Sequence, residues 1–523
     1  MIDSITTEVG RRRTFAIISH PDAGKTTLTE KLLLYSGAIA EAGAVRARAG
    51  RQRDVTSDWM EMERQRGISI TSTVLQFPHA GLVFNLLDTP GHRDFSEDTY
   101  RVLSAVDAAV IVLDAARGIE SQTLKLFQVA QARGLPLLTF VNKMDRPGLG
   151  PLALIDDIEA QLGISATPVT WPVGNGAEFE GVVDRRDGSL WRFERTARGG
   201  TIGDEEQAGL DAVANDPARE HALQELGLLD AIGADHDQKR FLAGESTPVF
   251  FGSALWNFGV RFLLDAVGEI APAPQPRPGR QGEARPIDDG LSGFVFKIQA
   301  NLDARHRDRL AFMRICSGRF DRGMSLINHR TGRSLSTKHA HQVFGRDRET
   351  VDIAYPGDVV GLVNATDLRI GDSLSVDGKA LFPPIPTFAP EHFRVARNLD
   401  TDKYKQFRRG ISQLDDEGVI QALNTFEGGE REPILAAVGE LQFEVAAYRL
   451  TNEFGASPHF ESAPYTVARR TDMHGKAKLA GRRGVEIATR TDGTILALFT
   501  SQAWLDAAQR DHPELTLDPI VGV

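Results

Sequence analysis

The chain has 523 residues, of which 41% are hydrophobic and 25% are charged. This composition excludes a disordered or collagen-like protein, and the length predicts several globular domains. The single cysteine, Cys316, excludes an internal disulfide framework and favours a reducing cytoplasm. No apolar run approaches the roughly 18 residues of a transmembrane helix, so we expect no membrane partner. The net charge of −11 comes from the first 276 residues, which argues against electrostatic binding of nucleic acid by that part.

The first predicted element is a phosphate-binding loop formed by Ser19, His20, Pro21, Asp22, Ala23, Gly24, Lys25 and Thr26. An apolar run at 15–18 precedes it, typical of a buried strand, and apolar residues at helical spacing follow it to Leu34. Backbone N–H groups of such a loop and the positive end of the helix surround phosphate oxygens. Lys25 would reach the β- and γ-phosphates, and the Thr26 hydroxyl would bind Mg²⁺. The usual motif opens with glycine where this chain has Ser19, so an ordinary strand-to-helix turn is the alternative.

A second motif follows the apolar run 82–87 and consists of Asp88, Thr89, Pro90, Gly91 and His92. Asp88, at the carboxyl end of a predicted parallel strand, suits a Mg²⁺ ligand that acts through a bound water. Gly91 can turn its N–H toward a γ-phosphate without steric cost. We therefore predict that Lys25 and Gly91 contact the reacting phosphate and that His92 orients the attacking water.

Two further strand ends predict the base-binding part of the site. The first carries Asn142, Lys143, Met144 and Asp145, and the second carries Ser253, Ala254 and Leu255. A carboxylate at Asp145 accepts hydrogen bonds from N1 and N2 of guanine, a donor pair that adenine lacks, so it selects GTP over ATP. The backbone of the second loop can contact the guanine O6. Motifs at successive strand ends match the carboxyl edge of an open α/β sheet, where ligands bind.

Together these motifs resemble those of the translational GTPases, the family of elongation factors Tu and G. The sequence Asp-Thr-Pro-Gly-His at 88–92 is typical of that family, and residues 19–22 and 59–71 look most like those of the class II release factors. The resemblance implies that Ser69 supplies a Mg²⁺-binding hydroxyl when GTP is bound, in addition to Thr26 and Asp88. It also implies that Pro21 and Ile68 flank the path of His92, although most relatives have valine in place of Pro21.

The hydrophobic periodicity predicts an α/β fold in which a P-loop GTPase domain with a parallel sheet precedes a β-barrel domain and a C-terminal α+β domain. We place these domains at 1–272, 290–386 and 387–523. An inserted subdomain is expected at about 150–245, with a hairpin at Asp187-Gly188 and a helix over 204–229. In the last domain, 401–414 and 440–453 have helical periodicity. The composition of the proline-rich linker at 273–289 predicts an extended, semi-rigid segment. We therefore expect few contacts between the domains on its two sides.

The resemblance implies a cytoplasmic, monomeric, ribosome-stimulated GTPase of translation termination. Such a factor uses GTP, GDP and Mg²⁺, binds the ribosome, and stimulates release of class I peptide chain release factors after the peptide has left. Two alternatives stay open. One is another ribosomal GTPase, such as a translocase or protection factor, for whose C-terminal domains we expect no room. The other is a GTP-dependent binding module with little hydrolysis, to which Ser19 and Ser69 point.

Overall fold

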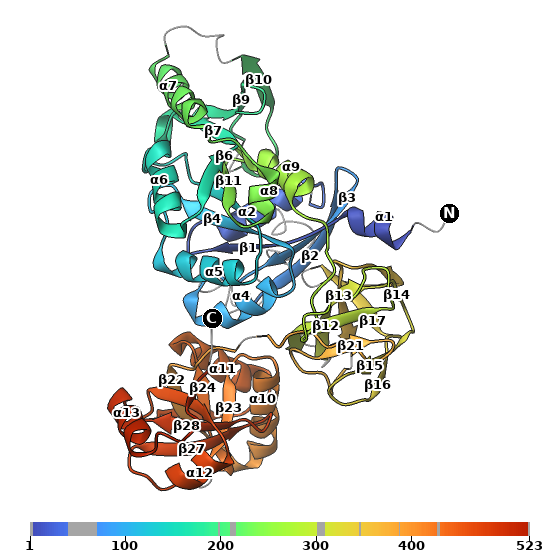
Figure 1. The fold of residues 1–523 in the computed structure, drawn as a ribbon, viewed down its shortest axis with the longest axis vertical. Helices are drawn as coiled ribbons and strands as arrows, with labels where there is room; N and C mark the ends of the chain where they lie inside the picture. The colour runs from blue at the N-terminus through green and yellow to red at the C-terminus, as the bar shows by residue number, and fades with distance from the viewer. Residues whose placement is uncertain are drawn as a thin grey trace.

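The computed structural model describes residues 4–39, 71–196, 199–209, 216–300, 309–344, 347–363, 365–385, 387–425 and 429–520. Figure 1 shows an N-terminal α/β part, a small β part and a C-terminal part with both helices and strands. The predicted fold class is therefore confirmed. In the part of the chain that the structure describes, no helix has the length and apolar character needed to cross a membrane.

The N-terminal part is built on a seven-stranded sheet of order β2-β3-β1-β4-β5-β11-β6. The β2–β3 pair is antiparallel, and the other described pairs of this sheet are parallel. Central strands such as β4 are buried along their whole length, as expected for parallel strands covered by helices on both faces. The strands are β1 (Arg12–Ser19), β2 (Thr73–His79), β3 (Leu82–Asp88), β4 (Ala108–Asp114), β5 (Leu137–Asn142), β6 (Ser165–Pro168) and β11 (Ser246–Phe251).

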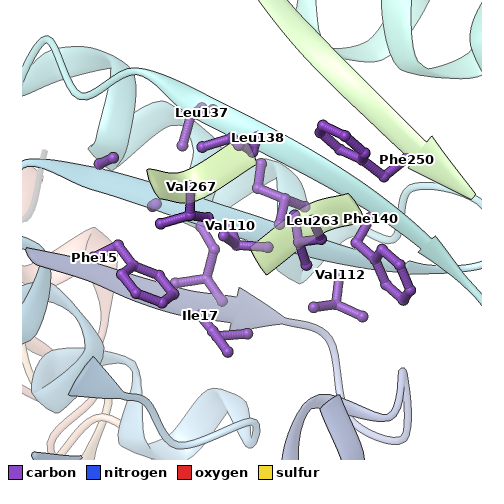
Figure 2. Packing of buried hydrophobic residues seen from close by; sticks show 14 of the residues in the cluster. Phe15, Ile17, Val110, Val112, Leu137, Leu138, Phe140, Phe250, Leu263 and Val267 are labelled. Carbon is purple, nitrogen blue, oxygen red and sulfur yellow. The ribbon is translucent and has the colours of Figure 1, made fainter. Parts of the chain in front are cut away.

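Helices of this part pack in two groups against the sheet. Helices α2 and α9 contact each other, whereas α5 contacts both α4 and α6. Figure 2 shows Leu263 and Val267 of α9 among side chains of β1, β4 and β5, so this helix helps to fix the strands whose ends form the site. The helices are α1 (Ile5–Gly10), α2 (Lys25–Tyr35), α4 (Ser96–Leu103), α5 (Ser121–Ala132), α6 (Pro151–Leu162) and α9 (Val260–Ile270), with a 3₁₀ turn η2 at Arg93–Phe95.

The inserted subdomain contains a separate four-stranded sheet of order β10-β9-β8-β7. Its strands are β7 (Thr170–Val173), β8 (Gly181–Asp184), β9 (Ser189–Phe193) and β10 (Glu205–Gly209), and its helices are α7 (Pro217–Ile232) and α8 (Gln238–Leu242). The β8–β9 hairpin confirms the turn predicted at Asp187-Gly188. Strand β6 pairs with β11 in the main sheet, so the separate sheet of the subdomain starts at Thr170, inside the expected bounds of about 150–245. One detail of the prediction is wrong. The segment 205–209 is a strand paired with β9 rather than the start of a helix.

The middle part is an antiparallel β structure, with eight strands in the order β16-β15-β21-β12-β13-β20-β17-β18 and a separate β14–β19 pair. Its interior is lined by apolar side chains, among them Val295, Met313 and Val360. The strands are β12 (Ser292–Ala300), β13 (Arg309–Ser317), β14 (Phe320–Asp321), β15 (Ser325–Asn328), β16 (Ser334–Ser336), β17 (Ala340–Phe344), β18 (Asp347–Thr350), β19 (Ile353–Ala354), β20 (Val359–Val363) and β21 (Ser373–Ser375).

The C-terminal part is a mixed domain on an eight-stranded antiparallel sheet of order β25-β22-β24-β23-β27-β28-β26-β29. Both predicted helices are present, as α10 (Tyr404–Asp416) and α11 (Glu440–Asn452). The other helices are α12 (Met473–Leu479) and α13 (Gln502–Asp511). The strands are β22 (His392–Asn398), β23 (Gln421–Thr425), β24 (Gly429–Ala437), β25 (Pro458–Ser462), β26 (Val467–Thr471), β27 (Val485–Arg490), β28 (Ile495–Phe499) and β29 (Asp518–Pro519).

The expectation of few contacts across the linker is wrong, because the GTPase and barrel parts share a buried polar centre. Arg12 of β1 forms an ion pair with Asp358, with Nε 2.9 Å from Oδ2 and both side chains almost fully buried. The other carboxylate oxygen of Asp358 accepts hydrogen bonds from the Asn85 and Gln76 amides at 3.1 and 3.0 Å. Barrel side chains such as Phe296 belong to the same apolar cluster as the GTPase core. The two parts therefore meet in a packed, charge-paired interface.

Linker and barrel also hold the end of α4, the helix that follows the His92 motif. Arg314 donates to the carbonyl oxygen of Ala105 at 2.7 Å and pairs with Asp107 at 2.7 Å. Arg277 of the linker donates to the Ser104 carbonyl oxygen. Cations at the carboxyl end of a helix satisfy its free carbonyl groups and its partial negative charge. The barrel and the linker therefore both contact the carboxyl end of α4 directly.

Candidate nucleotide-binding site

The predicted site residues come together at the carboxyl edge of the main sheet. Ser19 ends β1, Asp88 ends β3 and Asn142 ends β5, while Ser253 follows β11. These strands are neighbours, with β4 between β1 and β5. The two remaining residues of the prediction, Ser69 and Ile68, lie outside the described residues, so their roles stay predictions.

The phosphate-binding loop has the backbone conformation that its sequence requires. Asp22 and Gly24 have positive φ angles of 65° and 94°. A Cβ atom at Gly24 would lie 2.3 Å from the Asn142 side-chain nitrogen, so only glycine fits between this loop and the Asn142 loop. Helix α2 begins at Lys25, which leaves the first amides of the helix available to an anion. Ser19 therefore opens a loop whose decisive glycine is intact.

Lys25 and Asp88 form the charged centre of the site. The Lys25 Nζ atom lies 2.6 Å from Asp88 Oδ1, and both side chains are nearly buried. The Thr89 hydroxyl donates to the Ile17 carbonyl oxygen at 2.6 Å, which ties the start of the second motif to β1. The donor set of Thr26 and Asp88, a hydroxyl and a carboxylate, fits the all-oxygen coordination that Mg²⁺ prefers.

Asn142 connects the three loops. Its amide nitrogen donates to the Ala23 carbonyl oxygen at 2.7 Å, and its amide oxygen accepts from the Lys143 and Ala254 amides, each at 2.8 Å. Lys143 donates to the Asp22 carbonyl oxygen and pairs with Asp114 at 2.8 Å. Asn142 is only 2% exposed, so these bonds are shielded from water. The phosphate loop and the base loop are thus held as one unit.

The side chain of Asp145 is held by a hydrogen bond from Ser253. The Ser253 hydroxyl donates to Asp145 Oδ1 at 2.6 Å. The Met144 amide donates to the Gly252 carbonyl oxygen at 3.1 Å, which fixes the two loops against each other. Leu255 is 40% exposed at the rim. One oxygen of the carboxylate accepts this bond, and its second oxygen is of the type that the predicted contact with guanine donors requires.

Gly91 and His92 lie beside the phosphate loop. A Cβ atom at Gly91 would be 4.0 Å from Lys25 Cε and from Pro21 Cα, and the Gly91 carbonyl oxygen accepts from the Gln122 amide at 3.1 Å. The His92 ring caps the turn η2, because its Nδ1 accepts the Asp94 backbone N–H at 3.3 Å. About a third of the His92 side chain is exposed. The ring therefore adjoins the site and is held by its own downstream turn.

Three comparisons with known proteins bear on this arrangement. The family model "Elongation factor Tu GTP binding domain" matches residues 10–273, "Elongation factor G domain 2" matches 290–377, and "Class II release factor RF3, C-terminal domain" matches 382–509. A protein of a Synechocystis species named peptide chain release factor 3 is 49% identical, over 99% of this chain and 96% of its own length. The chain belongs to the peptide chain release factor 3 family. The Gloeobacter violaceus member is 51% identical over 89% of this chain and 88% of its own.

The fold of this release factor 3 family member is also found among solved structures. A crystal structure of a Thermus thermophilus protein superposes with a TM-score of 0.70, covering 92% of this chain and 73% of the other. At 24% sequence identity this similarity shows the fold alone.

Sequence reasoning missed two residues that organise the site of this family member. Asp114 holds Lys143, and its pKa lies below the usual value: burial raises it, but the hydrogen bonds from Lys143 and the Ala116 amide lower it more. Asp114 ends the apolar strand β4, so the signal that found Asp88 was also present here. Gln122 of α5, which holds Gly91, carries no local signal, because its partner is 31 positions away on the loop after β3.

Proposed function

We propose that this chain is a ribosome-stimulated GTPase of translation termination that promotes departure of a class I release factor after peptide release. The observation that carries the proposal is the joined set of phosphate and base loops around Asn142, in a chain that matches release factor 3 relatives over nearly its whole length. We also propose the division into domains at 1–272, 290–386 and 387–523, which the matched family segments support.

GTP would bind with its phosphates over the amides at the start of α2 and its guanine against Asp145. Lys25 would contact the β- and γ-phosphates, and the Gly91 amide would donate to the γ-phosphate. Thr26 and Asp88, with Ser69, would hold Mg²⁺ directly or through water. The ion, when bound, neutralises charge on the phosphates. The protein itself contributes positioning, because the Asn142 and Ser253 hydrogen bonds already hold the loops that carry these groups.

His92 would orient the attacking water after Gly91 has engaged the γ-phosphate. Its Nδ1 accepts the Asp94 amide, so the ring must leave this cap or turn about it to reach the water. Such a requirement would make hydrolysis slow in the free protein and faster on a ribosome that holds the ring in place. Loss of the γ-phosphate would then release Gly91 and the following turn, and the later domains would reorient. We place this activity in the cytoplasm and assign it to a monomer.

The proposal is tested on terminated ribosomes that carry a labelled class I release factor. We expect the label to leave faster when the protein is added with GTP than when it is added with GDP or without nucleotide. The matched control replaces Lys25 by Ala, which removes the phosphate contact and should abolish the acceleration. Equal departure with and without the protein would refute the termination role. GTP cleavage on ribosomes accompanied by movement of the messenger RNA, rather than by factor departure, would identify a translocase.

A further inference from the structure

The turn that carries His92 is joined to the C-terminal domain by a hydrogen bond to the carboxylate of Asp94. Asp94 Oδ2 accepts the backbone N–H of Leu441 at 2.9 Å, in a buried contact between residues 347 positions apart. Leu441 is the second residue of α11, whose first amides have no partner within the helix. The positive end of this 13-residue helix adds to the attraction for a negative group. Asp94 thus binds α11 from outside its own domain.

The same carboxylate also faces the histidine to which we assign the attacking water. Asp94 Oδ1 lies 3.4 Å from His92 Nδ1, next to the hydrogen bond from the Asp94 amide to that nitrogen. The Asp94 side chain is 8% exposed. Burial raises the pKa of Asp94, but the nearby His92 ring and the hydrogen bond from the Leu441 amide lower it more, so the net pKa is below the usual value. Asp94 is therefore an ionised group between the His92 ring and α11. The exposed Arg93 also faces it, at 3.5 Å.

The contact is close enough to transmit movement. Gly439, just before α11, packs so tightly on Asp94 that a Cβ atom there would lie 2.0 Å from the Asp94 Cγ atom. Phe95 forms an apolar cluster with Leu441 and Val445. Nearby, Arg101 of α4 donates to the Glu417 carbonyl oxygen at 3.2 Å. The C-terminal domain therefore holds the turn η2 through both polar and apolar contacts.

We propose that Asp94 is a positioning residue for His92 and that α11 controls it, an inference that rests on the role assigned to His92 above. While α11 holds the Asp94 carboxylate, the turn stays fixed and the His92 ring stays folded back as its cap. When the C-terminal domain withdraws, the turn is released. The carboxylate can then accept a hydrogen bond from a His92 Nδ1–H group. The ring is then oriented with Nε2 toward the attacking water. The C-terminal domain thereby restrains GTP cleavage until the ribosome moves it.

The first test separates the Asp94 carboxylate from α11 by a substitution in the C-terminal domain, so that the sequence of the GTPase domain is unchanged. In Gly439→Ala the three atoms nearest to the new methyl group all belong to the Asp94 side chain, which must move away, and the extended backbone at this position accepts alanine. The control is Gly150→Ala, which also lies just before a helix but has nothing within 4 Å of the added atom. We expect Gly439→Ala to raise single-turnover GTP cleavage by the free protein by about tenfold, the loss of one charge-assisted hydrogen bond. Gly150→Ala should match the wild type.

The second test removes the charge but keeps the contact. In Asp94→Asn the amide oxygen can still accept the Leu441 N–H, but no anion is left to accept a hydrogen bond from a His92 Nδ1–H group. We expect about tenfold slower cleavage on ribosomes, unchanged GTP affinity, and no rise in the free rate. A purely structural role would change both variants in the same direction. Amide hydrogen exchange at Leu441 should be faster in Gly439→Ala and unchanged in Asp94→Asn.

Two results would overturn the inference. The first is a rate of GTP cleavage by free Gly439→Ala protein equal to that of Gly150→Ala. The second is a raised rate in Gly439→Ala while the Leu441 amide exchanges hydrogen as slowly as in the wild type. The free-protein measurement needs no ribosome. It therefore tests the role of Asp94 independently of the proposed role in termination. A negative result in the assay of release-factor departure would not change it.

Discussion

Replacement of Asp145 by Asn should change the base that the protein prefers. The Ser253 hydroxyl donates to Asp145 Oδ1 at 2.6 Å, which leaves the second oxygen to face the base. After the substitution, the amide oxygen can keep the bond to Ser253, and this places the NH₂ group where the second carboxylate oxygen was. Guanine offers donors at N1 and N2, so the NH₂ group opposes a donor. Xanthine has a carbonyl oxygen at position 2, which can accept that hydrogen bond.

The expected size of the effect follows from the bonds lost. Each hydrogen bond to a charged group is worth about 1.5–3 kcal/mol, so two lost bonds weaken GTP binding by about 3–6 kcal/mol. This corresponds to a dissociation constant about 10²–10⁴-fold higher. Titration calorimetry with GTP, xanthosine triphosphate and ATP measures the three affinities under one set of conditions. We expect xanthosine triphosphate to gain affinity and ATP to remain weak.

A second variant tests the orienting role assigned to Ser253. Ser253→Ala keeps the Asp145 carboxylate and removes one hydrogen bond to it, so GTP affinity should fall by no more than about 1.5–3 kcal/mol, without any gain for xanthosine triphosphate. Unchanged GTP affinity in Asp145→Asn would refute the assignment of Asp145 to the base. Loss of GTP binding without a gain for xanthosine triphosphate would show that the loop, rather than base recognition, had been damaged.

The other predictions concern catalysis, stability and pH. His92→Ala should keep GTP affinity and ribosome binding but lose about 10²–10⁴-fold in ribosome-stimulated cleavage, measured in single turnover; a rate within a few-fold of wild type would make the ring structural. Asp358→Ala leaves the buried Arg12 without its barrel partner and should destabilise the protein by about 3–5 kcal/mol, whereas removal of the exposed Asp352 carboxylate should leave the unfolding midpoint nearly unchanged. Burial raises the pKa of Asp415. The folded state therefore binds its proton more tightly than the unfolded chain, and this stabilisation is lost as pH rises from about 4 through the raised value. Asp415→Asn has no carboxyl group to titrate, so it does not lose this stability as pH rises. The melting temperature of the variant minus that of the wild type should therefore increase from about pH 4 to pH 7. A difference that stays constant with pH would contradict a raised pKa of Asp415.

The nucleotide site could be predicted from the sequence because its parts are local. Each loop follows an apolar strand directly, so a strand end and a short motif suffice to place Lys25, Asp88 and Asp145 on one edge of the sheet. Helices α10 and α11 were also predictable from their periodicity. The same kind of reasoning was wrong for 205–209, where pairing with β9 overrides a local helical pattern.

Contacts between domains were decided by the tertiary structure. Arg12 and Asp358 are 346 positions apart, and Asp94 and Leu441 are 347 apart, so no local pattern connects either pair. The linker sequence predicted separation, but the chain packs the barrel against β1, β2 and β3 and buries their charges together. By itself, the sequence determined which chemistry the strand ends can perform, because that chemistry depends on side chains a few residues apart. Only the folded chain decided how the C-terminal domain contacts the turn after His92, because that contact depends on which distant surfaces pack together and exclude water.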